Sequence, residues 1–127
     1  MIYGIGIDIV HIPKFKQAIE KWGEKLENRL FTQNELAYCK KRRFPEQHLA
    51  ARFAAKEAFF KALGRAVQFS AVEVANGQDG KPCLSLIKRS YDQPSAFSLN
   101  FKTHLTLSHD GDYCVAQAVL ESTEPHP

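Results

Sequence analysis

From Tyr3 to Ile9, large apolar residues alternate with Gly4, Gly6 and Asp8 in the opening stretch MIYGIGIDIV. Such alternation is typical of a β-strand, in which successive side chains point to opposite faces. One face then carries Tyr3, Ile5, Ile7 and Ile9, and the other carries Ile2, Gly4, Gly6, Asp8 and Val10. Glycines inside a strand indicate that another group approaches the backbone closely, and a carboxylate among apolar residues requires a compensating partner. We therefore expect a positively charged group to approach the glycine-lined face at Asp8.

Between residues 12 and 64, apolar residues recur at three- and four-residue spacing, which predicts helices. The apolar stripe of the first helix consists of Ile12, Phe15, Ala18, Ile19 and Trp22. This helix should end at Gly23, and a short helix should follow over residues 24–30. Thr32 and Glu35 have the spacing of a capping box, so a second helix should start there and run towards Cys39. The third and longest helix should have Pro45 in its first turn and end at Gly64.

The second half of the chain alternates again. Residues 70–76 and 81–88, on either side of a QDG turn, predict one hairpin, and residues 104–110 and 112–122, joined by a DGD turn, predict another. Between the hairpins we expect one short helix after Pro94, and we expect residues 122–127 to form a frayed tail. The prediction is an α+β fold, a single small domain over residues 1–127 with an antiparallel β-sheet packed against one long and several shorter helices.

Composition narrows the class of protein. The 127 residues suit one domain with a real core, and no apolar run approaches the roughly 18 residues that a membrane span needs. The apolar N-terminal stretch lacks the basic region of a signal peptide. Three widely spaced cysteines, Cys39, Cys83 and Cys114, suggest neither a disulfide framework nor a zinc site. We expect a cytoplasmic protein with reduced thiols.

Charge is distributed unevenly along the chain. Residues 11–65 contain 13 Lys or Arg against 6 Asp or Glu, whereas residues 66–127 contain 4 against 7, within a net charge of +3. A basic first half suits an acidic partner, which could be a nucleic acid, a membrane surface, a phosphorylated ligand or an acidic protein. A solvated helix surface explains the same charges equally well.

Candidate chemistry gathers on the long helix. Glu57 lies four residues before Lys61, and the two could form an ordinary ion pair on one helix face. Alternatively, Glu57 and Asp8 together provide the carboxylate oxygens that Mg²⁺ takes alongside substrate phosphates. Arg52, Lys56 and Lys61 are either cations for phosphate oxygens or a solvated basic face.

The run Ser108-His109-Asp110 is not a catalytic triad, because adjacent residues of a strand point apart. His109 at a strand end is either a surface histidine or a donor to a phosphate.

Taken together, GIGIDIV (4–10), RFAAKEAFFKALG (52–64), GKP (80–82) and LTLSHD (105–110) resemble, in order and spacing, the holo-acyl-carrier-protein synthase family. These are the small bacterial 4′-phosphopantetheinyl transferases. The resemblance implies Mg²⁺-dependent transfer of the 4′-phosphopantetheine arm from coenzyme A, the co-substrate, to a serine of apo acyl carrier protein. The resemblance further implies that adenosine 3′,5′-bisphosphate is released and that the product serves fatty acid biosynthesis. It also implies a homotrimer with active sites between subunits, and neither a nucleic acid nor a membrane as partner.

The same resemblance implies roles for individual residues. Asp8 and Glu57 would hold Mg²⁺, and Lys61 would stabilise or protonate the departing phosphate. The positions matching coenzyme A contacts are Arg52, Lys61, Gly64, Pro82, Ser108 and His109, with His109 near the 3′-phosphate. Glu57 or a metal-bound water could be the general base. Lys14, Lys16 and Lys21 on the first helix would dock the acidic carrier protein.

The chain departs from the family pattern at several positions. Arg65-Ala66-Val67 stands in place of Thr-Gly-Ile, Lys14 in place of an arginine and His11 in place of an acid. From the residues alone, two other functions stay open. One is a non-catalytic nucleic-acid-binding module, which would bind polyanions with steep salt dependence. The other is a Mg²⁺-dependent phosphohydrolase that acts on coenzyme A or a nucleotide without a carrier protein.

Overall fold

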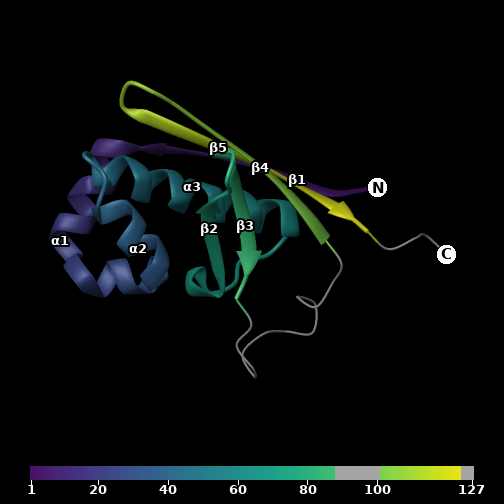
Figure 1. Ribbon diagram of the computed structural model, residues 1–127, viewed down its shortest axis with the longest axis horizontal. Coiled ribbons are helices and arrows are strands. Elements are labelled where there is room, and N and C mark those ends of the chain that lie inside the picture. Colours follow the sequence, from purple (N-terminus) through teal and green to yellow (C-terminus); the bar gives the residue numbers. More distant parts are fainter. Residues whose placement is uncertain (88–100, 124–127) are drawn as a thin grey trace.

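A computed structural model describes residues 1–87 and 101–123, and its helices and strands follow the predicted order (Figure 1). The elements are β1 (Ile2–His11), α1 (Ile12–Leu30), α2 (Gln33–Lys40), α3 (Pro45–Leu63), the short 3₁₀ helix η1 (Phe69–Ala71), β2 (Val72–Asn76), β3 (Pro82–Leu86), β4 (Phe101–Asp110) and β5 (Tyr113–Ser122). This arrangement confirms the α+β prediction.

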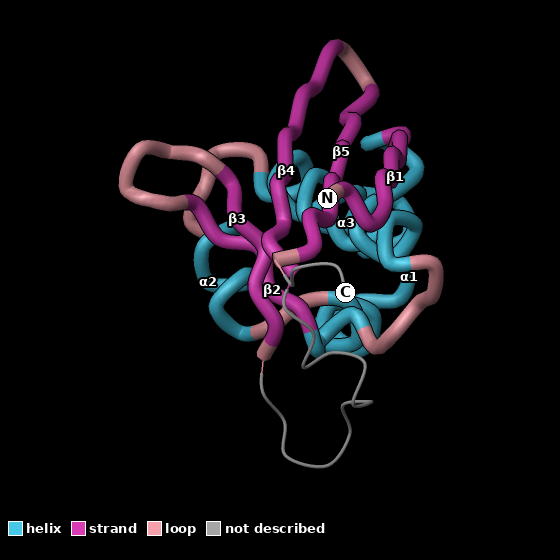
Figure 2. Tube along the Cα trace, turned by 90° about the vertical axis from the view of Figure 1, so that its right-hand side faces the viewer, coloured by secondary structure: helices cyan, strands magenta, loops and turns pink. Residues whose placement is uncertain are grey.

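The strands form two antiparallel sheets. β1, β5 and β4 make a three-stranded sheet in that order, and β2 and β3 make a separate two-stranded sheet. Figure 1 shows α3 lying along one face of the larger sheet, and Figure 2 shows the β2–β3 hairpin beside β4. Both predicted hairpins are therefore confirmed.

The glycines of β1 allow α3 to contact the sheet through its backbone. A Cβ atom on Gly4 would lie 1.9 Å from the carbonyl oxygen of Ala62, and one on Gly6 would lie 1.9 Å from that of Ala58. Ala58 and Ala62 are themselves buried. The close approach predicted at the glycine-lined face is thus made by α3, which places its side chains beside Asp8.

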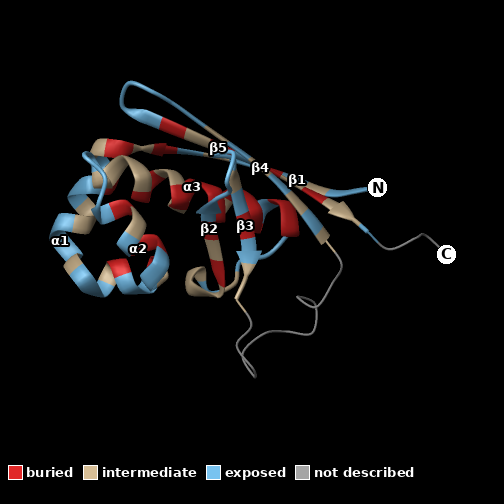
Figure 3. Ribbon diagram, in the orientation of Figure 1, coloured by how far each residue is buried: buried red, intermediate tan, exposed pale blue. Residues whose placement is uncertain are grey.

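The opposite face of β1 is exposed to solvent. Tyr3, Ile5, Ile7 and Ile9 are 54%, 61%, 58% and 62% exposed. Figure 3 shows how exposed and buried positions are distributed over the elements. The register places Val119 and Val115 of β5 opposite Ile5 and Ile9, so the apolar surface extends onto the next strand. A single chain therefore leaves an apolar sheet face uncovered.

The predicted helix boundaries agree with the structure. Gly23 has non-helical backbone angles (φ 60°, ψ −144°) and divides α1 into two parts. Thr32 and Glu35 form the expected capping box, and Gly64 ends α3 with φ 90°. Trp22 is an exception, because it belongs to the predicted apolar stripe but is 60% exposed, with the Lys21 ammonium 5.1 Å from its ring centre.

Three further sequence predictions can be compared with the structure: where the C-terminal tail begins, whether a helix follows Pro94, and whether any helix could span a membrane. Ser122 belongs to β5 and pairs with Phe101, so the predicted tail begins too early. The short helix predicted after Pro94 lies outside the described residues. Among the helices that the structure describes, none is long and apolar enough to cross a membrane.

A buried ion pair connects α3 to the elements around it. Lys56 and Glu35 have fully buried side chains, and the Lys56 ammonium donates to Glu35 Oε1 at 2.6 Å. The ammonium also donates to the carbonyl oxygens of Leu30 (2.8 Å) and Phe69 (2.9 Å). Burial lowers the pKa of Lys56, and the Glu35 carboxylate opposes that shift. Lys56 is therefore neither a solvated lysine nor a cation for substrate phosphates, which corrects both sequence interpretations.

Candidate active site

Lys61 is the cation that meets Asp8. Its ammonium donates to Asp8 Oδ1 at 3.1 Å and to the carbonyl oxygen of Ile7 at 2.9 Å. The Asp8 side chain is 16% exposed, whereas that of Lys61 is 53% exposed. Asp8 is thus held at the edge between β1 and α3, and the lysine that neutralises it faces solvent.

Glu57 lies one turn before Lys61 on α3. Burial, and then the negative charge of Asp8, raise the pKa of Glu57, while Lys61 lowers it. Within the described residues, the ion pair of Lys61 is with Asp8 and not with Glu57. The simple i, i+4 pair is therefore absent, and two carboxylates from different elements act on each other electrostatically.

The donor set fits a Mg²⁺ ion that is shared with a substrate. Mg²⁺ commonly binds one or two carboxylates and completes its shell with phosphate oxygens and water. Asp8 and Glu57 supply two carboxylates, and no cluster of three His, Cys, Asp or Glu side chains occurs in residues 1–87 and 101–123. A metal ion bound at these two carboxylates would therefore take its remaining ligands from phosphates and water.

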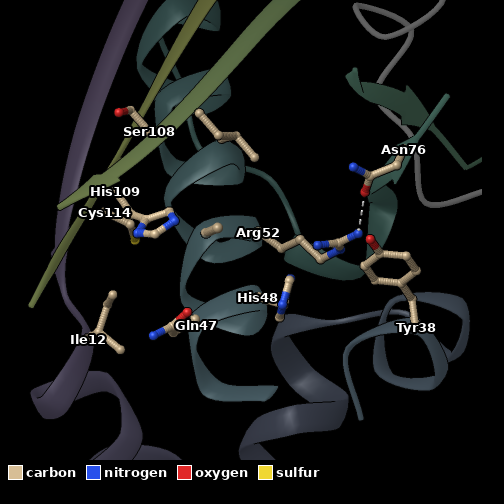
Figure 4. A pocket seen from close by; sticks show the side chains of 11 residues that line it. Ile12, Tyr38, Gln47, His48, Arg52, Asn76, Ser108, His109 and Cys114 are labelled. Atoms are coloured by element: carbon tan, nitrogen blue, oxygen red, sulfur yellow. Dashed lines mark hydrogen bonds between the residues drawn. The ribbon is translucent and has the colours of Figure 1, made fainter. Parts of the chain in front are cut away.

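A cavity of about 210 Å³ opens between α3, β4 and β2. Its polar lining includes Tyr38, His48, Arg52, Asn76 and His109, which come from the four elements α2, α3, β2 and β4 (Figure 4). Arg52 is 3% exposed, although it is a charged residue. A buried guanidinium in a cavity wall needs polar partners, and an anionic ligand would be a strong one.

Among the described residues, Arg52 is the one Lys or Arg side chain that lines the cavity, and no Asp or Glu lines it. Burial lowers the pKa of His48, and the charges of Arg52 and Arg42 lower it further. The Arg42 guanidinium lies 4.0 Å from the ring centre of Tyr38, which connects it to the same cluster. Positive charge without a neutralising acid on the lining favours an anion in this cavity.

Cys114 connects the cavity to the acidic pair. It lines the cavity, and burial together with the charge of Asp8 raises the pKa of its thiol to about 11. Cys114 pairs with Val10, two residues along β1 from Asp8, a separation of about 7 Å in a strand. Arg52 and Glu57 are five residues apart on α3, about 7.5 Å of helical rise. The cavity and the carboxylates are therefore neighbouring parts of one site.

The predicted site residues separate into three groups. Asp8, Glu57 and Lys61 come together as described, and Arg52, Ser108 and His109 line the cavity. The Ser108 hydroxyl, however, points away from His109 (Figure 4), as the alternation of a strand requires. Gly64, which caps α3, and Pro82, which begins β3, are not among the residues that line the cavity. Lys14, Lys16 and Lys21 are exposed on α1.

Sequence reasoning did not identify Tyr38, His48 and Asn76. Tyr38 lies in a short helix for which no chemistry was predicted, and Asn76 precedes a turn, where asparagine is common. His48 is close to Arg52 along the same helix, at i and i+4, and this spacing is the one signal that could have indicated it.

A family model described as the 4′-phosphopantetheinyl transferase superfamily matches residues 4–118. The chain belongs to this superfamily. The resemblance predicted from its motifs is thereby confirmed. Two curated relatives of the transferase are called holo-[acyl-carrier-protein] synthase. That of Trichlorobacter lovleyi is 44% identical, covering 96% of this chain and 99% of the relative, and that of Geobacter sulfurreducens is 45% identical, covering 95% and 98%.

Solved structures agree with this membership. The holo-(acyl-carrier-protein) synthase of Bacillus anthracis, in complex with coenzyme A (3′,5′-ADP), is 36% identical over 97% of this chain and 99% of its own, with a TM-score of 0.79. The enzyme of Neisseria meningitidis is 31% identical over 96% and 100%, with a TM-score of 0.82. The predicted transferase fold is thus confirmed over nearly the whole chain.

Proposed function

We propose that this transferase moves the 4′-phosphopantetheine arm of coenzyme A onto a serine of apo acyl carrier protein. The observation that carries the proposal is the juxtaposition of a cationic cavity built around Arg52 with the carboxylates of Asp8 and Glu57. Coenzyme A has phosphates at two places, the pyrophosphate and the 3′-phosphate. A site with one anion cavity and one metal-binding carboxylate pair suits both.

The cavity suits the 3′-phosphate end of coenzyme A. At about 210 Å³ it is smaller than the roughly 300–1,000 Å³ of pockets that enclose whole drug-sized ligands. It therefore holds a fragment of coenzyme A and not the whole molecule. Arg52 and His109 on its walls are the donors we assign to the 3′-phosphate. The pyrophosphate then extends along α3 towards Glu57 and Lys61.

The reaction is a phosphoryl transfer. The serine oxygen of the carrier forms a bond to the β-phosphorus of coenzyme A, and the bond from that phosphorus to the bridging oxygen breaks. The exposed Lys61 ammonium is placed to neutralise or protonate the phosphate of the departing adenosine 3′,5′-bisphosphate. Glu57, one turn before Lys61 on α3, is our candidate for the group that accepts the serine proton. Bound Mg²⁺, held by Asp8 and Glu57, would supply neutralisation of the pyrophosphate charge.

We assign the exposed lysines of α1 to the carrier protein. Lys14, Lys16 and Lys21 are all exposed, and the first residue after β1, Ile12, is also in the cavity wall. An acidic partner on α1 would consequently lie next to the site that modifies it. His11 stabilises this helix where the family has an acid, because its Nδ1 accepts a hydrogen bond from the Lys14 backbone N–H at 3.2 Å.

We further propose that the transferase assembles as a homotrimer with active sites at subunit interfaces. The exposed apolar face of β1 supports a permanent contact, because large exposed apolar patches mark interaction surfaces. Asp8 lies on this strand and Lys61 of α3 donates to it, so we infer that a neighbouring subunit would complete the walls of the site. Free thiols at Cys39, Cys83 and Cys114 support a place in the cytoplasm, where the modified carrier would serve fatty acid synthesis.

Intact-mass spectrometry tests the transfer. We expect purified transferase, Mg²⁺ and coenzyme A to add about 340 Da to an apo acyl carrier protein, the mass of the phosphopantetheine arm. A carrier in which the acceptor serine is replaced by alanine should stay unmodified. Release of adenosine 3′,5′-bisphosphate without a carrier would instead indicate the phosphohydrolase. An unmodified carrier, alongside a control enzyme that modifies it, would contradict the proposal.

A further inference from the structure

Asn76 holds the buried guanidinium of Arg52 from one side. It is the last residue of β2, and its Oδ1 accepts a hydrogen bond from an Arg52 terminal nitrogen at 2.9 Å (Figure 4). Its Nδ2 donates to the carbonyl oxygen of Gly80 at 3.1 Å, across the hairpin turn. Both ends of the amide are thereby engaged, so the orientation of Asn76 is fixed by the hairpin and the oxygen faces Arg52.

Tyr38 holds the same guanidinium from a second direction. Its ring centre lies 4.3 Å from the Arg52 guanidinium carbon and 4.0 Å from that of Arg42. Contacts at these distances are cation–π interactions, and they are stronger when desolvated. Because Tyr38 belongs to α2 and Asn76 to β2, two separate elements restrict the same side chain.

One polar atom of Arg52 has no partner. Arg52 Nε is the single buried side-chain nitrogen or oxygen in the described residues that lacks a hydrogen bond. Buried polar groups are nearly always paired, so an exception in a cavity wall indicates a group that meets a ligand. Arg52 is otherwise well held, and its free donor is therefore a property of the site and not of a loosely placed side chain.

We propose that Asn76 and Tyr38 are positioning residues that orient Arg52 and so set the preference for coenzyme A over dephospho-coenzyme A, which lacks the 3′-phosphate. The inference rests on the proposed function, in which Arg52 meets that phosphate. Neither residue needs to contact the ligand. Both act through the direction in which the guanidinium presents its donors, and Arg recognises phosphate through such fixed geometry.

The side chains of Asn76 and Tyr38 are chemically suited to positioning Arg52. An amide oxygen and an aromatic face both bind a guanidinium without cancelling its charge, whereas a carboxylate at position 76 would neutralise it. The lining of the cavity contains no Asp or Glu side chain among the described residues, so the charge of Arg52 is not neutralised there. Arg52 is thus immobilised and still fully available to an anion.

The test compares kcat/KM for coenzyme A and for dephospho-coenzyme A, with apo carrier protein as acceptor. Asn76→Ala should lower the value for coenzyme A about tenfold, the size expected for one charge-assisted contact. The value for dephospho-coenzyme A should change less than about twofold, because that substrate has no group for Arg52 to meet. Tyr38→Leu should shift the ratio in the same direction.

Matched controls separate positioning from folding. Asp79→Ala removes a turn contact of the same hairpin, the bond from the Lys81 backbone N–H to Asp79 Oδ1 at 3.0 Å, and leaves Arg52 untouched. Tyr38→Phe keeps the ring. Both controls should keep the wild-type ratio. The double variant Asn76→Ala with Arg52→Ala should have the ratio of Arg52→Ala alone, since residues that act through one another are not additive.

Each failure has its own meaning. If Arg52→Ala leaves the ratio unchanged, the proposed placement of the 3′-phosphate is wrong. If Arg52→Ala lowers the ratio but Asn76→Ala and Tyr38→Leu do not, the positioning inference is wrong while the placement survives. Equal losses with both substrates, shared by Asp79→Ala, would reveal a damaged hairpin and overturn the role of Asn76, and Tyr38→Leu would then decide the remaining half of the proposal.

Discussion

Asp8 combines two roles that the sequence could not separate. A carboxylate on a glycine-lined strand face requires a positive partner, and both a lysine and a metal ion satisfy that requirement. In the metal-free chain the partner is Lys61, at 3.1 Å from Asp8 Oδ1. Glu57 has no such partner in the described residues, and its raised pKa records the cost of keeping it charged. The charged Glu57 carboxylate, which we assign to the function, therefore lowers the stability of the metal-free fold.

Replacing Glu57 by glutamine should stabilise the metal-free protein at neutral pH. The folded-state pKa of Glu57 is raised above its ordinary value of 4.5, so the folded state binds this proton more tightly than the unfolded state. Wild-type stability consequently falls as pH rises from about 4.5 through the folded pKa. Glu57→Gln lacks this loss. In EDTA its Tm should exceed that of the wild type by a few degrees at pH 8, with no gain at pH 4, and transfer activity should be absent.

Thermal melts at both pH values check this expectation, and Glu20→Gln on the exposed side of α1 is a suitable control. A Glu57→Gln protein that melts at or below the wild-type temperature at pH 8 would contradict the origin assigned to the pKa shift.

Gly6→Ala tests the close contact between β1 and α3. The added Cβ would lie 1.9 Å from the Ala58 carbonyl oxygen, and backbone on both sides leaves little room to move. We expect a loss of about 3 kcal/mol or more in the free energy of unfolding, at the upper end for overpacking a core. Urea denaturation measures it. Gly77→Ala is the matched control, because its Cβ would meet a flexible Asp79 side chain at 3.3 Å, and it should change stability by less than about 0.5 kcal/mol.

At the scale of elements, the Lys56–Glu35 pair determines how the helices are arranged. Lys56 of α3 donates to the end of α1, to α2 and to η1, and Glu35 Oε2 accepts from the Val74 backbone N–H of β2 at 2.8 Å. Five elements therefore meet at one buried pair of charges. All three ammonium protons have acceptors, which is the condition under which a buried ion pair is tolerated.

Lys56→Met should destabilise the fold strongly. The methionine fills similar volume but leaves the Glu35 carboxylate buried without its cation, and breaking a buried pair in this way costs about 3–5 kcal/mol. Lys25→Met, at an exposed position of α1, should change little. Chemical denaturation compares the two. In the double variant Lys56→Met with Glu35→Gln, part of the loss should be recovered, because no unpaired charge is left. A double variant less stable than either single one would contradict the assignment.

Most elements could be predicted from local patterns. The capping box of Thr32 and Glu35, the stop at Gly64 and the two hairpins each depend on residues close together in the sequence, and all appear in the structure. Trp22 could not be placed, because its helical spacing is that of a core residue and its exposure depends on which elements pack nearby. Lys56 was misread for the same reason, since its partner lies 21 residues away.

The residues of the candidate site also differ in whether the sequence alone could identify them. Asp8, Glu57 and Lys61 could be identified because a residue type out of place in its pattern, or a family motif, marks each of them. Tyr38 and Asn76 carry no such mark, and their role exists because α2 and β2 both end beside Arg52. Sequence reasoning thus found the residues of the proposed chemistry but not those that hold them.

At the scale of the whole molecule, the sheet has one face buried under α3 and one face uncovered. β1 contributes Ile5, Ile7 and Ile9 to the uncovered face, each more than half exposed. For a chain of 14.4 kDa this is a large apolar surface to leave in water. The same strand carries Asp8 on its other face, which packs against α3.

Ile7→Glu tests the proposed trimer together with its link to activity. A charge at the centre of the apolar face would be buried unpaired in an assembly but solvated in a single chain, so it should dissociate the trimer without unfolding the subunit. Light scattering should give three times the 14.4 kDa of one chain for the wild type and 14.4 kDa for the variant.

Gln78→Glu, an equally charged change at an exposed turn, should keep the trimer and the activity. Transfer by Ile7→Glu should fall in parallel with the trimer fraction, because a single chain supplies Asp8, Glu57 and the Arg52 cavity but not the neighbouring wall. A monomeric Ile7→Glu protein with full transfer activity would show that each chain forms a complete site. A wild type that is itself a monomer would overturn the trimer directly and leave the isoleucine face to another partner.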